Sequence, residues 1–160
     1  MQTVQAQQAR LTRVFRRDGN SFEPVTVNLS DFVALGAPTA LPASSGYSLC
    51  QAFRSKAEGG EIVYAPALFK LGRIVATPAA IDVLEQHGKT PFDFIGRHLA
   101  GDWSHQTESD ALENAASAEK GYRVFSSYYL TDDQGEDAPK VWVITEHDRS
   151  VTTVLLPSDY

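Results

Sequence analysis

Cysteine is nearly missing from this sequence, since Cys50 is the only one among 160 residues. A single thiol cannot form an intramolecular disulfide, and it cannot build a cysteine-based zinc cluster within one chain. The neighbours of Cys50 are mostly small or apolar and include no evident base, which favours a buried thiol over a nucleophile. A reducing cytoplasm is the compartment that such a chain is expected to occupy.

Long apolar runs are missing as well. The stretch over 151–157 is among the longest, and it is far shorter than the roughly 20 residues that cross a bilayer. The first 15 residues lack the apolar core of a signal peptide. We therefore expect a protein that neither spans a membrane nor is exported.

Positive charge is scarce, because 14 lysines and arginines face 20 aspartates and glutamates and leave a formal charge of −6. Broad binding of nucleic acid needs a concentrated positive surface, so this balance argues against it. The hydrophobic share of 42% and the charged share of 21% are close to those of ordinary folded domains. A folded globular protein is expected.

The signatures of common enzyme classes are not found either. There is no glycine-rich phosphate loop, nucleophile elbow or dinucleotide fingerprint, and Gly59-Gly60 indicates only a turn. His98, Asp102 and His105 could offer two imidazoles and a carboxylate, but their spacing is not that of a catalytic metal site. We expect neither a metal nor a cofactor.

The first half of the chain opens with a hairpin signal. Asp18-Gly19 is typical of a tight hairpin turn, and apolar residues alternate with polar ones on both sides of it. Ser30 is a suitable N-cap for a short helix. The elements expected here are strands over 11–15 and 22–27, a helix over 30–35, a linker over 36–46, a helix over 48–56 and a strand over 62–64.

The second half carries stronger local signals. Thr77-Pro78 and Thr90-Pro91 each place a capping hydroxyl before a proline, and Gly88, Gly101 and Gly121 are placed to end helices. The expected elements are a strand over 69–75 with a bulge at Gly72, helices over 78–87, 91–100 and 107–120, and strands over 122–130, 141–146 and 151–156. Short links favour an antiparallel meander for the last three strands.

Together these elements predict an α+β fold, in which the helices group on one face of a sheet rather than alternating with parallel strands. An N-terminal hairpin and extension come first, followed by a strand, two to three short helices and a three-stranded antiparallel meander. Because the strong signals begin after residue 65, we expect residues 1–65 to form an extension or small subdomain and residues 66–160 a compact α+β domain.

Four phrases give the second half a family resemblance: LGRIVATPAAID, RHLAGDW, a helix containing Glu113-Asn114, and VWVITEHDRSVTTVLLPSDY. In their order and wording they resemble a family of small proteins carried on bacterial plasmids and other mobile elements. Its members are called plasmid-related proteins and are sometimes labelled restriction-system subunits. The resemblance covers about residues 71–160, and it implies a genetic context rather than an activity.

Two polar clusters are the candidate sites. The first lies where the second helix ends, and it comprises Arg97, His98, Asp102, Trp103 and His105. In a structural interpretation Trp103 anchors the loop, Asp102 accepts bonds from backbone amides and His98 is half-buried. In a functional interpretation this loop, which follows a rigid helix, binds a ligand.

The second cluster lies on and between the last two strands, and its main members are His147, Asp148, Arg149, Thr152 and Thr153. Alternation would place Thr152 with Val154 on one face of the sheet and Thr153 on the other. A structural interpretation is a charged turn flanked by threonines at ordinary strand positions.

Two functions remain open. The first is a non-enzymatic accessory protein of a mobile element, with a regulatory or anti-defence role as one form, that binds a macromolecular partner, most simply a protein. Its binding residues would be Arg97, Asp102, Trp103, His105, His147 and Asp148.

The alternative is a metal-independent ribonuclease of the barnase, colicin and RelE type, with RNA as its partner. His98 would move protons, Arg149 would stabilise phosphate charge, and Thr152 or Thr153 would position the phosphate. For this chemistry His98 and Arg149 must lie on one side of the sheet and flank a cleft.

Overall fold

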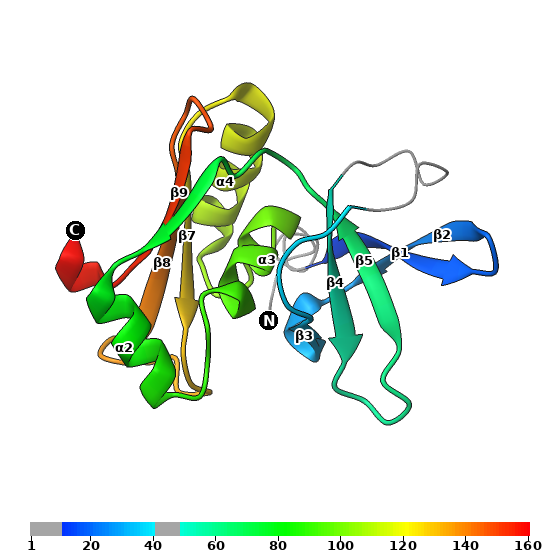
Figure 1. Cartoon of the computed structure of the whole chain (residues 1–160), viewed down its shortest axis with the longest axis horizontal. Coiled ribbons are helices and arrows are strands. Elements are labelled where there is room, and N and C mark those ends of the chain that lie inside the picture. Colours follow the sequence, from blue (N-terminus) through cyan, green and yellow to red (C-terminus); the bar gives the residue numbers. More distant parts are fainter. Residues whose placement is uncertain (1–10, 41–48) are drawn as a thin grey trace.

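Two β-sheets lie on either side of one helix in the computed structural model, which describes residues 11–40 and 49–160 (Figure 1). The first sheet is antiparallel, with the order β2-β1-β5-β4-β3. Its strands are β1 (Thr12–Asp18), β2 (Ser21–Val27), β3 (Phe32–Ala34), β4 (Cys50–Ser55) and β5 (Ile62–Pro66). The second sheet has the order β6-β9-β8-β7, and only β6 and β9 pair in parallel. Its strands are β6 (Arg73–Ala76), β7 (Val124–Tyr129), β8 (Lys140–Thr145) and β9 (Val151–Leu155).

The helices of the described residues are α2 (Pro78–Gln86), α3 (Phe92–Ala100) and α4 (Glu108–Lys120), with short 3-10 helices η1 (Leu29–Asp31) and η3 (Pro157–Asp159). None of these helices has the length and apolar character needed to cross a membrane. The architecture confirms the expected α+β fold, from the β1–β2 hairpin to the antiparallel meander of β7, β8 and β9.

Helix α3 is buried on both sides because two hydrophobic cores share it. Ile95 and Leu99 belong to the core under the second sheet, together with buried residues of α2 and α4, whereas Ala100 belongs to the core of the first sheet. Gly96 approaches β4 so closely that a Cβ there would overlap the Gln51 side chain.

The division of the chain into residues 1–65 and residues 66–160 stays a prediction. The two parts touch through α3, which belongs to the second part and packs against strands of the first.

Most local helix signals of the second half are realised, but Thr90 does not cap α3, whose N-cap is Pro91 without a side-chain hydrogen bond. Thr77 accepts a hydrogen bond from the Ala80 amide, and Thr107 accepts one from the Asp110 amide. Gly101 ends α3 and Gly121 ends α4, each in the left-handed conformation that glycine adopts without strain.

One expected helix in the first half is wrong, because β4 occupies most of the range 48–56. Its residues pair with β3 on one side and β5 on the other, and the register places Phe53 opposite Val63, both completely buried. Weak local propensity is overridden here by burial within a sheet. The expected linker over 36–46 lies partly outside the described residues.

The helix expected to start at Ser30 is also shorter than predicted. Asn28, not Ser30, is the N-cap of the single turn η1, and its side chain accepts bonds from the Ser30 amide and hydroxyl. The chain then enters β3 at Phe32, which is buried in the core of the first sheet. Burial of that ring ends the helix after one turn.

The strand expected over 69–75 begins only at Arg73, because Gly72 takes a positive φ of 64°. Gly72 packs directly against the turn between β8 and β9, and a Cβ at this position would overlap the carbonyl oxygens of Arg149 and Ser150. Two conditions therefore require glycine here, the backbone conformation and the close approach of a second backbone.

Replacing Gly72 with alanine is expected to lower the free energy of unfolding by about 2 kcal/mol, because strain and overlap with backbone atoms add together. Gly88→Ala is the matched control, since Gly88 also has a positive φ but a Cβ there would meet no atom within 4 Å. That control should cost only about 1 kcal/mol. Urea unfolding measures both values, and equal losses would contradict the close approach at Gly72.

Candidate functional site

The His98 side chain, which was expected to be half-buried, is completely buried between α3 and the second sheet. Its Nδ1 lies 2.6 Å from Ser126 Oγ, and its Nε2 lies 2.8 Å from Thr145 Oγ1. Trp103 Nε1 donates to the same Ser126 oxygen at 2.8 Å, and Thr152 Oγ1 lies 2.7 Å from Thr145 Oγ1. A chain of buried hydrogen bonds thus crosses β7, β8 and β9.

The directions of these hydrogen bonds follow from the protons available. Thr152 donates its one hydroxyl proton to the Leu71 carbonyl, so Thr145 must donate to Thr152. The Thr145 oxygen then accepts from His98 Nε2–H. At the other end the Ser126 oxygen accepts the indole N–H, and its proton points to Nδ1 of His98. A neutral imidazole therefore satisfies every donor and acceptor in the chain.

The same surroundings oppose a charge on His98. Burial lowers its pKa to about 3, and the positive charge of Arg149 acts in the same direction. A neutral, completely buried imidazole cannot transfer protons to a ligand, and Thr152 is equally buried. The ribonuclease hypothesis gains no support from the position of these residues.

Arg149 lies on the same side of the second sheet as His98, with the Phe69 ring in contact with both. The ring centroids of Phe69 and His98 are 5.0 Å apart, and the Arg149 guanidinium carbon lies 5.4 Å from the Phe69 centroid. Arg149 donates to the carbonyls of Ser117, Tyr122 and Glu146. It therefore joins the β8–β9 turn to the C-terminal end of α4, where a cation suits the helix dipole. Thr153 lies on the opposite face from Thr152, as alternation predicted.

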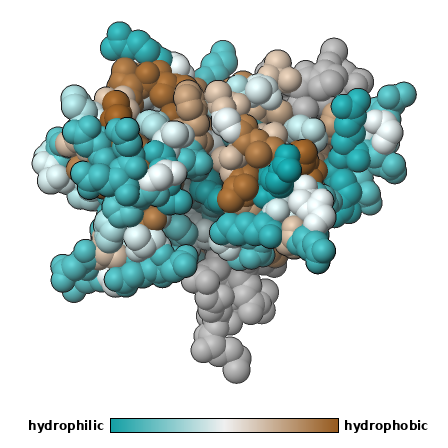
Figure 2. Space-filling model, turned by 60° about the horizontal axis from the view of Figure 1, so that its bottom comes forward, coloured by the Kyte–Doolittle hydropathy of each residue, from teal (hydrophilic) through white to brown (hydrophobic). Residues whose placement is uncertain are grey.

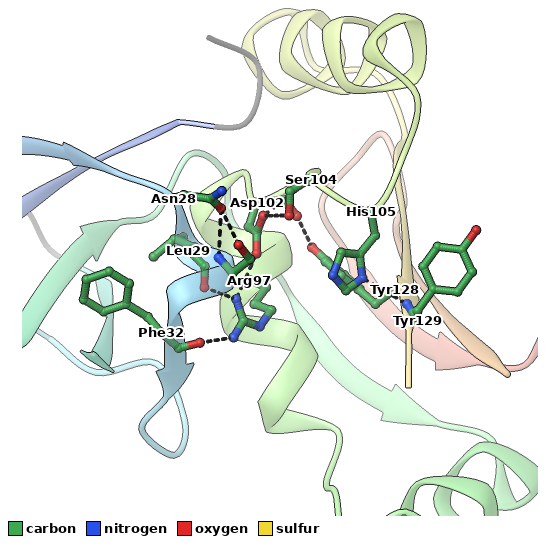
Figure 3. Close-up of polar contacts among 10 residues, drawn as sticks. Asn28, Leu29, Phe32, Arg97, Asp102, Ser104, His105, Tyr128 and Tyr129 are labelled. Atoms are coloured by element: carbon green, nitrogen blue, oxygen red, sulfur yellow. Dashed lines mark hydrogen bonds and ion pairs between the residues drawn. The ribbon is translucent and has the colours of Figure 1, made fainter. Parts of the chain in front are cut away.

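Arg97 and Asp102 form a nearly buried ion pair at the end of α3 (Figure 3). One terminal nitrogen of Arg97 donates to Asp102 at 2.9 Å and to the Leu29 carbonyl at 2.7 Å, and the other donates to the Phe32 carbonyl. The remaining Asp102 oxygen accepts from the Ser104 hydroxyl at 2.7 Å. Because the carbonyls belong to η1 and β3, this pair fastens α3 to the first sheet.

Trp103 and His105, the other members of the first cluster, have different surroundings. Trp103 is 5% exposed and belongs to the core. His105 is half-buried, and its Nδ1 accepts a hydrogen bond from the Tyr129 amide at 3.0 Å (Figure 3). Burial lowers the pKa of His105, so the imidazole acts as a neutral acceptor at the edge of β7.

His147 and Asp148 lie in an exposed turn away from the first cluster. The turn follows Thr145, which pairs with Val124 at the start of β7, whereas His105 contacts the far end of that strand. Six residues of β7 separate the two ends by about 17 Å. Hydrogen bonds from Ser150 lower the pKa of Asp148, which is the behaviour of a turn carboxylate. His147 and Asp148 therefore do not share a site with His105.

Surface hydrophobicity does not identify a binding face by itself. On the face shown in Figure 2, hydrophobic side chains gather in patches between larger hydrophilic areas. One apolar hollow of about 250 Å³ is lined by Leu11, Leu68 and Leu112 among others, but few polar groups converge in it. A better indication of a binding site is a hollow with apolar walls into which a few polar groups point.

Such a hollow, of about 550 Å³, lies between α4 and the outer face of β7 and β8, and we call it the α4–β7 groove. Its lining is His105, Gln106, Thr107, Asp110, Glu113, Asn114, Ser117, Arg123, Phe125, Ser127, Tyr129 and Trp142. The residues from α4 share one helix face, because their spacing of three and four matches the helical turn. The residues from β7 alternate, so they lie on the outer face of the sheet.

Half-buried aromatic rings form the floor of the α4–β7 groove. The Phe125 and Trp142 centroids are 4.8 Å apart in an edge-on contact, and Tyr160 extends this row at 5.7 Å from Trp142. Tyr160 is 70% exposed, so the aromatic surface continues beyond the groove. Tyr129 lies toward the other end of the floor, with Lys140 over its ring.

The charges at the rim of the groove are unequal. Arg123 is paired with Glu146 at 3.5 Å and donates to the Tyr160 hydroxyl at 3.0 Å. Asp110 and Glu113, both exposed on α4, have no ion-pair partner within the described ranges 11–40 and 49–160. Negative charge is therefore left uncompensated on the helix side of the groove.

Side chains from α4 and the preceding loop cover the free edge of β7 at two positions. Asn114 accepts from the Phe125 amide at 3.1 Å and donates to the Phe125 carbonyl at 2.7 Å. Gln106 donates to the same carbonyl, and His105 accepts from the Tyr129 amide. These contacts replace the missing neighbouring strand and prevent extended edge-to-edge pairing.

Ser127 lies between these two covered positions. Backbone groups of alternate residues in a strand point the same way, and those of Phe125 and Tyr129 point away from β8. The Ser127 N–H and carbonyl must therefore point into the groove, and neither has a hydrogen-bond partner among the residues that the structure describes. One donor and one acceptor are left open at the floor of the site.

Sequence reasoning identified only one lining residue of this groove as a candidate, His105. Glu113-Asn114 contributes to the family resemblance, but no chemistry is predicted for this pair from the sequence. A signal was present, because Asp110, Glu113 and Asn114 share a helical face and Phe125, Ser127 and Tyr129 alternate. The sequence did not indicate the β7–β8 register, which places Ser127 opposite Trp142.

In the described part of the chain, no group of three or more histidine, cysteine, aspartate or glutamate side chains could hold a metal ion. No protein-family model matches the chain, and neither a curated protein nor a solved structure does.

Proposed function

We propose that this protein is a non-enzymatic binding protein that holds a segment of a protein partner in the α4–β7 groove. The observation that carries the proposal is the row of partly exposed aromatic rings at Phe125, Trp142 and Tyr160, beside the open backbone groups of Ser127. Buried or half-buried aromatic residues supply much of the binding energy at protein interfaces. A surface of this kind suits a macromolecule that extends past the groove.

A protein partner fits the charges better than a nucleic acid does. Asp110 and Glu113 at the rim form no ion pair with any residue that the structure describes, and the chain as a whole carries a formal charge of −6. Phosphate groups would be repelled by such a surface, whereas polar and basic groups of a protein would not.

The side chains with catalytic chemistry are engaged in holding the fold together. His98 has no exposed surface, and the guanidinium of Arg149 donates to three carbonyls. The resemblance of residues 71–160 to plasmid-borne proteins extends the proposal to an accessory role on a mobile genetic element, with regulation or anti-defence as its form.

The proposal is tested by recovering the tagged protein from bacterial cells and identifying what co-purifies. Replacing both Trp142 and Tyr160 with alanine is expected to reduce recovery of the partner at least about tenfold, because interface aromatics are frequent hot spots. Ile81→Ala is the control, since Ile81 is 44% exposed on α2 and does not line the groove. A partner retained by the double variant, or lost with Ile81→Ala, would contradict the proposal.

A further inference from the structure

The open backbone groups of Ser127 limit what can enter the α4–β7 groove. Phe125 and Tyr129, the next positions that face outward, are covered by Asn114 and His105. The covered positions are four residues apart, or about 13 Å. An added strand could therefore pair through one residue only, and that residue would exchange both hydrogen bonds with Ser127.

The side chain of such a partner residue would point to the face on which the Ser127 side chain lies. On that face, Phe125 and Tyr129 would be the diagonal neighbours of the partner residue. Trp142 lies on the far side of Ser127, because it pairs with Ser127 on β8. On the other side lies α4, with the carboxylates of Asp110 and Glu113 at the rim. The bound side chain would thus lie between aromatic rings and two carboxylates.

These surroundings favour a cation. Aromatic faces attract ammonium and guanidinium groups, and carboxylates form charge-assisted hydrogen bonds with them. The chain uses the same contact itself, because Lys140 lies 5.7 Å from the Tyr129 centroid and the Arg123 guanidinium lies 5.5 Å from that of Tyr160. Lys140 lies beside the groove, and Arg123 at the rim is paired with Glu146, so among the described residues the carboxylates of Asp110 and Glu113 are left without a cation.

We infer that the α4–β7 groove recognises a short extended segment of a partner protein through one arginine or lysine residue. Its backbone pairs with Ser127, and its cationic side chain lies between the aromatic floor and the carboxylates of Asp110 and Glu113. This inference rests on the proposed function and names the chemistry of the partner.

Nuclear magnetic resonance titration tests the inference with two blocked pentapeptides, one with arginine at its centre between serine and glycine residues, and one with neutral citrulline in its place. The arginine peptide is expected to shift the Ser127 amide and Trp142 indole signals, with a Kd of about 1 mM or tighter. The citrulline peptide should bind at least about fivefold more weakly, because it keeps the backbone pairing and loses the charge.

Three variants locate the contacts. Asp110→Asn combined with Glu113→Gln should remove the preference for arginine, whereas Glu119→Gln, on the opposite side of α4, should leave it intact. Ser127→Pro should abolish binding of both peptides, because it removes the outward N–H. The β7–β8 ladder does not use that N–H, so the fold should persist.

Equal affinity for the two peptides would overturn the inference that the bound side chain is cationic. The groove would remain a peptide site, so the proposed function would stand. No shift in the groove with either peptide would overturn the inference outright. The proposed function would then be judged on its own by partner recovery with the Trp142 and Tyr160 variants. A preference for arginine that survives Asp110→Asn combined with Glu113→Gln would also overturn the assignment.

Discussion

Lowering the pH from 7 to 4 is expected to reduce the free energy of unfolding by about 3 kcal/mol through His98 alone. Its pKa is about 3 in the folded protein and about 6.5 in an unfolded chain. Between these values the unfolded state binds more protons, so stability is full above pH 6.5 and falls as the pH drops toward 3. At pH 4 the loss covers about 2.5 units of 1.36 kcal/mol each. Urea unfolding at pH 7, 5.5 and 4 measures it.

The matched control is His98→Gln. A glutamine oxygen can accept from Ser126 and its amide nitrogen can donate to Thr145, but the side chain does not titrate. The variant should therefore lose about 3 kcal/mol less than the natural protein between pH 7 and 4. Asp148 and Asp159, whose pKa values are lowered by hydrogen bonds, lose their contribution mainly below about pH 4 and do so in both proteins. Parallel losses would show that His98 is not the titrating group.

The buried chain of hydrogen bonds around His98 could not be predicted from sequence. Its partners are 28 and 47 residues away from His98, and the bond from Thr152 to Leu71 spans 81 residues. Alternation predicted correctly that Thr152 faces one side of the sheet. Which side is buried, and which hydroxyls line up across three strands, depends on register, and no local pattern specifies register before the strands pair.

The second half of the fold was predictable because its signals are local. A threonine that caps a helix, or a glycine that ends one, acts within four residues, so Thr77, Thr107, Gly101 and Gly121 could be read directly. The first half depends on contacts that are distant in sequence. β4 is a strand because it lies between β3 and β5, and its own residues favour neither state.

The candidate site also combines features that are local in sequence with contacts that are distant in sequence. Each wall of the α4–β7 groove has a readable period, three and four on the helix and two on the strand. The groove itself exists because Asn114 and His105 hold α4 and its preceding loop against the edge of β7. These contacts join residues that are distant in sequence, so no local pattern indicates the groove, whereas the polar residues at the end of α3 are conspicuous in the sequence although they serve to join elements.

Replacing Arg97 with alanine is expected to lower the free energy of unfolding by about 3–5 kcal/mol, which is typical when one partner of a buried ion pair is removed. The Arg97 side chain is 14% exposed and that of Asp102 is 3% exposed, so the carboxylate would keep its charge away from water without a counter-ion. The carbonyls of Leu29 and Phe32 would lose their donor as well. Urea unfolding at pH 7 measures the change.

Two further variants separate the buried charge from the lost packing. Arg97→Met keeps much of the apolar stem, and adding Asp102→Asn removes the uncompensated carboxylate, so the double variant should be more stable than Arg97→Met alone. Arg123→Met breaks the exposed pair with Glu146, whose side chains are 39% and 41% exposed, and should cost less than about 1 kcal/mol. If Arg97→Ala cost no more than Arg123→Met, the ion pair would not be what fastens α3 to the first sheet, and that role would fall to the apolar contacts of Ala100 with the core of that sheet.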